Sequence, residues 1–267
     1  MYADTSNVPD SSTPSTSYPR VTIITAVYNA QNYLEECILS VINQTYTNFE
    51  YIIIDGGSTD NTIDIIKKYQ DKISYWKSEP DNGIYDAWNK GLAQAEGEWI
   101  SFVGADDQLL PDAIDTYVNH IINHPRQHRL QFVSSRIELV DEKLTPLRIV
   151  GEAWTWEYFK LSMITWHVGA FHSKRLFKEY GIFDSSYKIS GDYELLLRPR
   201  NHLITSFIDH LTVRMRTGGT SAKNLARASE ETYRAKIKNR IISPLKGNIM
   251  IYVDRLRLLI RSFEGGR

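Results

Sequence analysis

An alternation of apolar runs with helical patterns over residues 21–107 limits the fold more than any other feature of the chain. Four runs, rich in β-branched or aromatic residues, end in polar turns: VTIITAVYN (21–29), FEYIIIDGGS (49–58), ISYWKSEP (73–80) and EWISFVGADD (98–107). Three segments with apolar residues at helical spacing lie between them: AQNYLEECILSVINQ, TDNTIDIIKKYQ and GIYDAWNKGLAQAEG. This alternation predicts an α/β fold with a mostly parallel central sheet flanked by helices.

Two of the three helical segments carry end signals. Ser58 or Thr59 is the expected N-cap of the second helix, and Gly97 is the expected stop of the third.

Polar residues follow each of the four predicted strands. Ligands of parallel α/β sheets bind beyond the carboxyl ends of the strands, so these residues predict a binding site on one rim of the sheet. They are Tyr28 and Asn29, Asp55 to Ser58, Glu79 to Asn82, and Asp106 with Asp107.

The rest of the chain predicts one continuous domain with an extension at each end. Residues 1–19 are rich in Ser, Thr and Pro and are expected to form a disordered leader. Residues 20–222 form the expected domain, with further helices over 111–125 and 192–202 and strands over 130–141 and 202–221. Residues 223–267 are basic and predict a helical C-terminal extension.

Composition excludes several classes of protein. A net charge of −1 over 267 residues argues against nucleic-acid binding through a broad basic field. The single cysteine, Cys37, excludes an internal disulfide and is expected to be an inert core thiol. The absence of a signal peptide and of an apolar run of about 18 residues predicts a cytoplasmic protein. The last helix mixes apolar residues with arginines, which predicts contact with the inner face of the plasma membrane, packing on the domain or a homodimer contact.

Three pieces of the chain resemble family 2 of the inverting nucleotide-sugar glycosyltransferases, which have the GT-A (Rossmann-like) fold. They are VTIITAVYNAQNYLEECILSVINQTYTNFEYIIIDGGSTDNT, GIYDAWNKGLAQAEGEWISFVGADD and GIFDSSYKISGDYELLLR. The resemblance runs from Val21 to Gly219. Within the family, the sequence is similar to bacterial enzymes that build surface polysaccharides. It implies a nucleotide-sugar donor, a divalent cation (Mn²⁺ or Mg²⁺) and a single carboxylate as general base.

The resemblance implies that Asp106 and Asp107 form the metal motif. Asp107 is the expected metal ligand, and Asp106 is expected near the ribose or a metal-bound water. The family often has another Asp where this chain has Gly104, which leaves the number of protein ligands open. Alternatively, the pair caps a helix that begins near Pro111.

The resemblance places the nucleotide over the first two strand ends and the following helix. The implied contacts are Thr25, Val27, Tyr28, Asp55, Gly56, Asp86, Lys90 and Asp106. Gly56 replaces a carboxylate that can hydrogen-bond uracil in the family, so Asp55 is the remaining carboxylate of the DGGSTD motif. A uridine nucleotide is still the expected donor. The alternatives are a tight capped turn for DGGSTD and a solvated helix face for Asp86 and Lys90.

Asp192 in SGDYELLLR matches the general base of the family, and Gly191 before it lets the backbone pass close to a ligand. The alternatives are that Asp192 caps the helix after it, or that Glu194 is the base.

His167 and Trp166 are implied near the acceptor or the diphosphate, with core packing as the alternative. A sugar-stacking platform or core packing is expected for Trp154 and Trp156. Diphosphate binding or an exposed strand end is expected for Arg214 and Arg216.

The leading hypothesis is an inverting, metal-dependent glycosyltransferase of the hexosyltransferase type. Such an enzyme moves a sugar from a nucleotide donor to a glycan or lipid-linked acceptor in polysaccharide biosynthesis. The donor is expected to be UDP-linked. One alternative is a nucleotidyltransferase, but TAVYNAQNY lacks the glycine-rich basic loop usual after the first strand of such enzymes. The other is a catalytically silent nucleotide-binding module, which predicts loss of the carboxylates present at Asp107 and Asp192.

Overall fold

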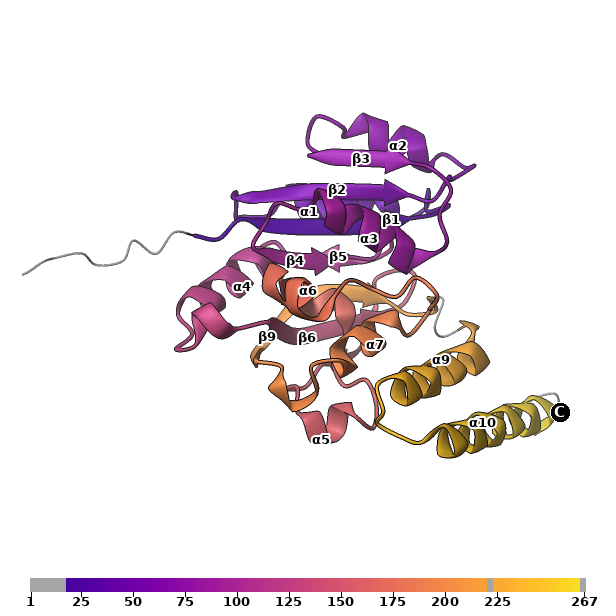
Figure 1. The fold of residues 1–267 in the computed structure, drawn as a ribbon. Coiled ribbons are helices and arrows are strands. Elements are labelled where there is room, and N and C mark those ends of the chain that lie inside the picture. Colours follow the sequence, from indigo (N-terminus) through magenta and orange to yellow (C-terminus); the bar gives the residue numbers. More distant parts are fainter. Residues whose placement is uncertain (1–17, 220–222, 265–267) are drawn as a thin grey trace, which may run out of the picture.

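The computed structural model describes residues 18–219 and 223–264 (Figure 1). Residues 1–17 of the predicted leader lie outside this range, and the domain boundaries at residues 19 and 222 stay predictions. The strands are β1 Val21–Val27, β2 Phe49–Asp55, β3 Tyr75–Ser78, β4 Trp99–Phe102, β5 Gln108–Leu109, β6 Phe132–Val140, β7 Pro146–Val150, β8 Ala170–Ser173 and β9 Thr205–Arg216. The helices are α1 Leu34–Ile42, α2 Thr62–Lys68, α3 Ile84–Gln94, α4 Ala113–Ile122, α5 Trp156–Phe159, α6 Lys174–Tyr180, α7 Gly191–Leu197, α9 Leu225–Lys238 and α10 Pro244–Glu264. Three short 3₁₀ turns are η1 Gln127–Arg129, η2 His167–Gly169 and η3 Arg200–His202.

The α/β fold class is confirmed: the strands form one sheet in the order β3-β2-β1-β4-β8-β6-β9-β5, with β7 paired to β6. The first four strands are parallel, as the alternation with helices predicts. The second half is mixed, because β8 runs antiparallel to both β4 and β6. The parallel strands therefore deliver the four predicted polar turns to one rim, at the right of the sheet in Figure 1.

Both faces of the sheet are buried under helices, and successive residues of β1 and β2 alternate between the two cores. Val21 and Ile23 of β1 lie in the core beneath α1, α2 and α4. Ile24, next in sequence, lies in the core beneath α3, α6, α7 and α9. The near-continuous apolar runs of the sequence follow from burial on both sides.

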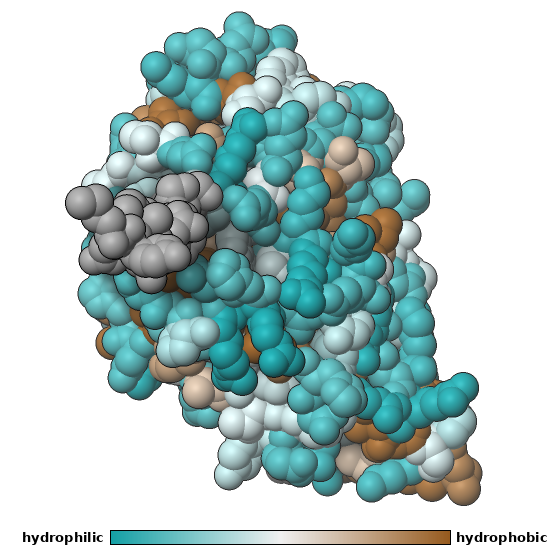
Figure 2. All heavy atoms as spheres, turned by 60° about the vertical axis from the view of Figure 1, so that its left-hand side comes forward, coloured by the Kyte–Doolittle hydropathy of each residue, from teal (hydrophilic) through white to brown (hydrophobic). Residues whose placement is uncertain are grey.

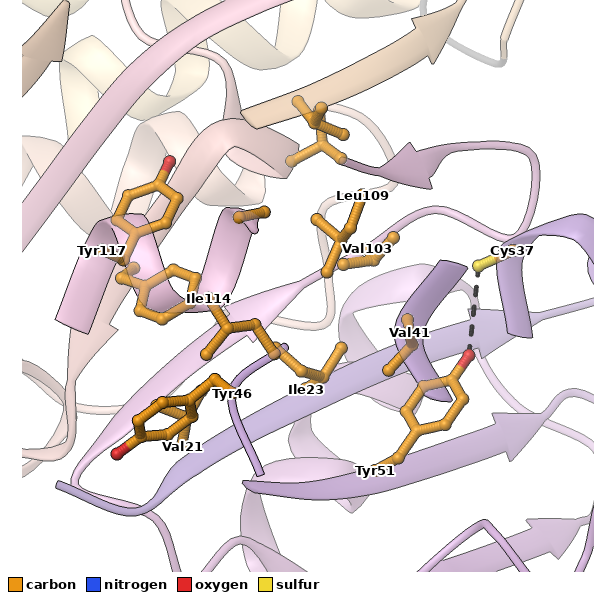
Figure 3. Close-up of a cluster of buried hydrophobic side chains, with 14 of the residues drawn as sticks. Val21, Ile23, Cys37, Val41, Tyr46, Tyr51, Val103, Leu109, Ile114 and Tyr117 are labelled. Carbon is orange, nitrogen blue, oxygen red and sulfur yellow. Dashed lines mark hydrogen bonds between the residues drawn. The ribbon is translucent and has the colours of Figure 1, made fainter. Parts of the chain in front are cut away.

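Cys37 is a buried free thiol, as the sequence predicts. Its sulfur lies 3.9 Å from the Tyr51 hydroxyl in the core shown in Figure 3. Burial first, and the charge of Asp107 second, raise the pKa of the Cys37 thiol to about 12. The thiol therefore stays protonated and unreactive.

Both predicted helix-end signals were wrong. The N-cap of α2 is Asn61, and the side chain of Asp60 accepts the Thr62 amide at 3.0 Å instead. Helix α3 ends at Gln94, and its C-cap is Ala95 rather than Gly97. A Cβ at Gly97 would lie 2.6 Å from the Thr22 amide nitrogen, so this glycine allows a close approach to β1 rather than a helix stop.

The helices α9 and α10 follow β9 and lie together at the lower right of Figure 1. Exposed apolar side chains recur along α10 at steps of three or four residues: Leu245, Ile249, Tyr252, Leu256 and Ile260. The lower right of Figure 2 shows hydrophobic atoms at this end of the molecule. Within the described ranges, no helix has both the length and the apolar composition needed to cross a bilayer.

Candidate active site

The turn after β2 is held together by Asp55, whose carboxylate is completely buried. One oxygen accepts the Ser58 hydroxyl at 2.5 Å, and the other accepts the Ser78 hydroxyl at 2.6 Å and the amides of Gly57 and Ser58. Both of its oxygens therefore accept hydrogen bonds from within the protein. Asp55 therefore ties the ends of β2 and β3 together, and its carboxylate is not exposed on the rim where the nucleotide contact was expected.

The contact residues predicted at the end of the first strand are partly buried in the protein and partly exposed. Thr25 is buried and accepts the Tyr51 hydroxyl at 3.1 Å. Val27 is also buried, and its carbonyl accepts the Gly56 amide at 2.8 Å. Tyr28 is 65% exposed. Of these three side chains, the structure leaves Tyr28 for contact with a ligand.

The N-terminus of α3 carries the other predicted nucleotide contacts. Asp86 accepts the Asn82 amide at 2.9 Å. The Lys90 ammonium lies 3.0 Å from a carboxylate oxygen of Glu79 and 3.8 Å from Asp86. Lys90 and Asp86 are about three-quarters buried, so the alternative of a freely solvated helix face does not describe them.

Asp106 and Asp107 follow β4 on the same rim. Asp107 is buried and Asp106 is half-buried, and neither carboxylate forms an ion pair with a described residue. Burial, reinforced by the adjacent charge of Asp106, raises the pKa of Asp107 well above its ordinary value. The helix-capping alternative is wrong, because β5 separates the pair from α4, whose N-cap is Asp112.

Arg216, at the end of β9, donates hydrogen bonds to the turn that carries Asp106 and Asp107. Its side chain is 5% exposed, and its guanidinium donates to the Asp106 carbonyl at 2.6 Å and to Glu36 at 2.5 Å. Its amide donates to the Asp107 carboxylate at 3.2 Å. Arg216 is therefore neither a free diphosphate ligand nor an exposed strand end, while Arg214 is 43% exposed and pairs with Glu138.

The Asp106–Asp107 pair fits a hard divalent cation. Its donors are carboxylate oxygens, and its negative charge is not balanced by an ion pair within the described residues. The described part of the chain contains no group of three or more His, Cys, Asp or Glu placed to hold a metal. A Cβ at Gly104 would lie 2.5 Å from an Asp107 oxygen, so a side chain at residue 104 would require the Asp107 carboxylate to shift. Two protein ligands, completed by phosphate and water oxygens, is a common pattern for Mg²⁺.

Asp192 lies in the first turn of α7 and is 18% exposed. The Tyr85 hydroxyl lies 3.0 Å from one Asp192 oxygen, which also accepts the Tyr193 amide at 2.8 Å. Burial raises the pKa of Asp192, and these two hydrogen bonds oppose the rise. The N-cap of α7 is Ser190, so Asp192 does not cap the helix.

Gly191 is required for this arrangement. A Cβ there would lie 2.8 Å from the Tyr85 ring, which packs against the turn that carries Asp192. The sequence pointed to a close approach at Gly191 but did not identify Tyr85 as the partner.

His167 lies beside Asp192, with its Nδ1 atom 4.0 Å from a carboxylate oxygen. Its ring stacks on Trp88 with centroids 4.5 Å apart, and neither ring nitrogen has a hydrogen-bond partner among the described residues. Burial, then the neighbouring His172, lower the pKa of His167 well below its ordinary value. His167 is therefore a neutral ring beside Asp192, and its two ring nitrogens have no hydrogen-bond partner among the described residues.

The other residues implied near the acceptor do not all lie with Asp192 and His167. Glu194 is fully buried and pairs with Arg198 at 2.5 Å and Lys238 at 3.1 Å, which removes it as an alternative base. Trp154 and Trp156 pack against the core beneath α7. Trp166 lines a surface cavity of about 340 Å³ with Arg136, Arg148 and Met163.

Glu231 of α9 is a residue of this site that the sequence did not reveal. Its carboxylate is 3% exposed and accepts the consecutive amides of Lys188, Ile189 and Ser190 at 2.8 to 3.1 Å. Arg227 donates to it at 3.0 Å. Glu231 thus fixes the loop that enters α7, and its charge contributes to the raised pKa of Asp192.

Glu231→Gln is expected to lower kcat roughly 10- to 100-fold, because hydrogen bonds to a charged group are lost from the loop that carries Asp192. Removing the charge also lowers the pKa of Asp192, so the acid limb of the pH–rate profile moves to lower pH.

Tyr85→Phe removes a hydrogen bond to the Asp192 carboxylate, which raises the pKa of Asp192, so the acid limb of the variant's pH–rate profile moves to higher pH. Profiles of kcat from pH 4 to 9 measure both shifts (about the range that carboxyl and imidazole groups titrate). If the acid limbs of both variants stay where the wild type has its own, Glu231 and Tyr85 do not influence the pKa of Asp192 as expected.

Comparison with known proteins gives concordant matches. A sequence model described as "Glycosyl transferase family 2" matches residues 22–184. An uncharacterized glycosyltransferase of Rickettsia typhi is 31% identical over 225 residues, which is 81% of this chain and 70% of that protein. The chain spans only 30% of a longer relative from Rickettsia conorii.

Two solved structures share the fold. Residues 1–349 of TarS from S. aureus, in complex with UDP, match with a TM-score of 0.63 and 19% identity, over 87% of this chain and 69% of that chain. The mannosyltransferase PcManGT from Pyrobaculum calidifontis, in complex with GDP-Man and Mn²⁺, matches with a TM-score of 0.62 and 18% identity, over 90% and 70% of the two chains.

Proposed function

The chain belongs to glycosyl transferase family 2, and we propose that it is an inverting, metal-dependent enzyme that moves a sugar from a nucleotide-diphosphate donor to a glycan or lipid-linked acceptor. The observation that carries the proposal is the Asp106–Asp107 pair, whose carboxylates form no ion pair with a described residue. It lies on the rim where the ends of β1, β2 and β3 also converge. A pair of this kind suits a cation that binds together with a diphosphate.

The donor, in this proposal, lies across the ends of the parallel strands. Tyr28 and the turn after β2 face the nucleoside, and Asp106 and Asp107 hold a divalent cation. When bound, the cation would supply positive charge to the departing diphosphate. Fold similarity to proteins solved with UDP and with GDP-Man and Mn²⁺ supports this placement of the donor.

Asp192 is the proposed general base. As the acceptor hydroxyl attacks the anomeric carbon, its proton passes to Asp192, and the bond between that carbon and the diphosphate oxygen breaks on the opposite face. The configuration is inverted in one displacement, and no covalent enzyme intermediate forms. A raised pKa suits Asp192 to this role, because a base with a pKa nearer to neutrality accepts a proton more strongly. The role proposed for His167 is to hydrogen-bond the acceptor or the diphosphate, because its two buried ring nitrogens have no partner among the described residues.

The test is nucleotide release from a panel of nucleotide sugars, measured with Mn²⁺ or Mg²⁺ and with and without acceptor extracts. Release of nucleotide that depends on both the cation and the acceptor is expected, with inverted configuration in the product. Retained configuration, or no release from any donor in the panel, would contradict the proposal. The panel also tests the expected hexosyl group and UDP linkage, and the acceptor extracts test the role in polysaccharide synthesis.

The exposed stripe of α10 supports the predicted contact with a membrane surface, in preference to a homodimer. Lys246, Arg255 and Arg257 flank the stripe. Arg255 pairs with Glu230 of α9, and Arg257 pairs with the partly buried Asp254. Apolar side chains between cations suit an anionic lipid surface. Co-sedimentation with vesicles that contain anionic lipid, and none with neutral vesicles, is the expected result. A concentration-dependent dimer that binds neither kind of vesicle would favour the other alternative.

A further inference from the structure

The carboxylate of Asp81 lies against Gly56, at the position that a side chain on residue 56 would occupy. A Cβ built on Gly56 would be 2.6 Å from Asp81 Oδ2 and 3.1 Å from its Cγ. Asp81 comes from the loop between β3 and α3, so it reaches Gly56 from a neighbouring strand end. The chain thus has a carboxylate at the end of β2, although residue 56 does not supply it.

Asp81 differs from the other acidic residues around the turn after β2, because one of its oxygens has no hydrogen bond or ion pair with a described residue. Asp55 has both oxygens occupied by hydrogen bonds, and Asp60 accepts from the amides of Thr62 and Gln31 with one oxygen each. Glu79 pairs with two lysines. Asp81 Oδ1 accepts the Gly83 amide at 2.7 Å, while Oδ2 forms no hydrogen bond or ion pair with a described residue.

The loop that carries Asp81 is fixed at both ends. The Glu79 amide donates to the Asp55 carbonyl at 3.0 Å, and Lys90 donates to the Pro80 carbonyl at 3.3 Å. The Asp81 side chain is half-buried and held by its bond to Gly83. A charged acceptor in a fixed position next to bare backbone is suited to recognising a flat group that carries an N–H donor.

We infer that Asp81 recognises the nucleobase of the donor by accepting a hydrogen bond from a protonated ring nitrogen. This inference rests on the proposed use of a nucleotide sugar. Uracil N3 and guanine N1 carry such a proton. The corresponding ring nitrogens of cytosine and adenine are acceptors, which a carboxylate repels. Asp81 therefore selects uridine or guanosine donors, and the missing carboxylate at Gly56 does not remove this selection.

The experiment is isothermal titration of UDP, GDP, CDP and ADP into the full chain with Mg²⁺ present. The wild type is expected to bind UDP or GDP in preference to CDP and ADP. Asp81→Asn keeps an acceptor for the Gly83 amide but removes the charge. It is expected to lower the affinity for the preferred nucleotide about 10- to 100-fold. Asp64→Asn is the matched control, because Asp64 is 78% exposed on α2, and it is expected to leave affinity unchanged.

A relocation variant separates recognition from damage to the loop. Asp81→Gly alone is expected to lose the preference, and Gly56→Asp combined with Asp81→Gly is expected to recover part of it. Equal affinity of Asp81→Asn and wild type, or an equal loss for all four nucleotides with no recovery in the double variant, would overturn the inference. Failure of the wild type to bind any of the four nucleotides would instead count against the proposed function.

Discussion

Asp192→Asn is expected to lower the rate of sugar transfer by about 10²- to 10⁴-fold, the usual contribution of a general base. The amide has the same shape and can still accept the hydrogen bonds from Tyr85 and Tyr193, so the fold of α7 is preserved. It cannot take the proton from the acceptor hydroxyl at neutral pH. The proposed nucleotide contacts lie at other strand ends, so affinity for the nucleotide is expected to stay within about twofold of the wild type, which is less than 1 kcal/mol.

Two measurements distinguish this result from unfolding. Calorimetric binding of the nucleotide reports the donor site, and single-turnover transfer reports the chemical step. Glu194→Gln is the matched variant on the same helix: it breaks a buried ion pair, so it is expected to lower the melting temperature and leave the chemical step intact. Full activity in Asp192→Asn would refute the assignment of the base.

Asp107→Asn is expected to change activity and stability in opposite directions. Loss of the carboxylate removes a ligand of the proposed cation, which supplies several kcal/mol to the reaction, so activity falls at least about 10²-fold. Stability without metal rises, because burial raises the pKa of Asp107 and the ionised carboxylate therefore destabilises the fold. The gain is expected at pH values above the ordinary pKa of a carboxyl group and disappears below it, where Asp107 is protonated in both states.

Thermal melting at pH 4 and pH 8, with and without Mn²⁺, tests the second part. The wild type is expected to gain stability from Mn²⁺ at pH 8, and Asp107→Asn is expected to gain little. Asp106→Asn serves as the comparison and is expected to have smaller effects, because Asp106 is half-buried and its backbone carbonyl, rather than its carboxylate, accepts from Arg216. Turnover that survives a chelator and the Asp107→Asn substitution would contradict the role given to this residue.

The periodicity of the sequence predicts most of the first half of the sheet. Each apolar run between residues 21 and 102 became a parallel strand. The runs of β1, β2 and β4 are nearly continuous because these strands are buried on both faces, whereas β3 is a partly buried edge strand. The antiparallel strand β8 could not be predicted in the same way. It has four residues, and its pairing with β4 and β6 depends on contacts between distant segments.

The candidate site was predictable where a carboxylate without an internal partner follows a strand, as at Asp106, and less so where polar residues bond to each other. A motif does not show whether Asp55 faces a ligand or the turn that contains it, and here it faces the turn. It also does not show that Arg216, 109 residues after Asp107, donates its amide to that carboxylate. Long-range partners of this kind are set by the packing of the sheet and leave no local pattern.

The contact between Glu231 and the Lys188–Ser190 loop has a consequence for the modularity of the enzyme. Helix α9 lies beyond the segment that the family sequence model matches, yet its carboxylate holds the turn that leads to the proposed base. A chimera that joins residues 1–222 to the carboxyl-terminal segment of a relative would leave three amides without their acceptor unless the graft also supplies an acid there. The transferable unit is therefore the α/β domain together with α9.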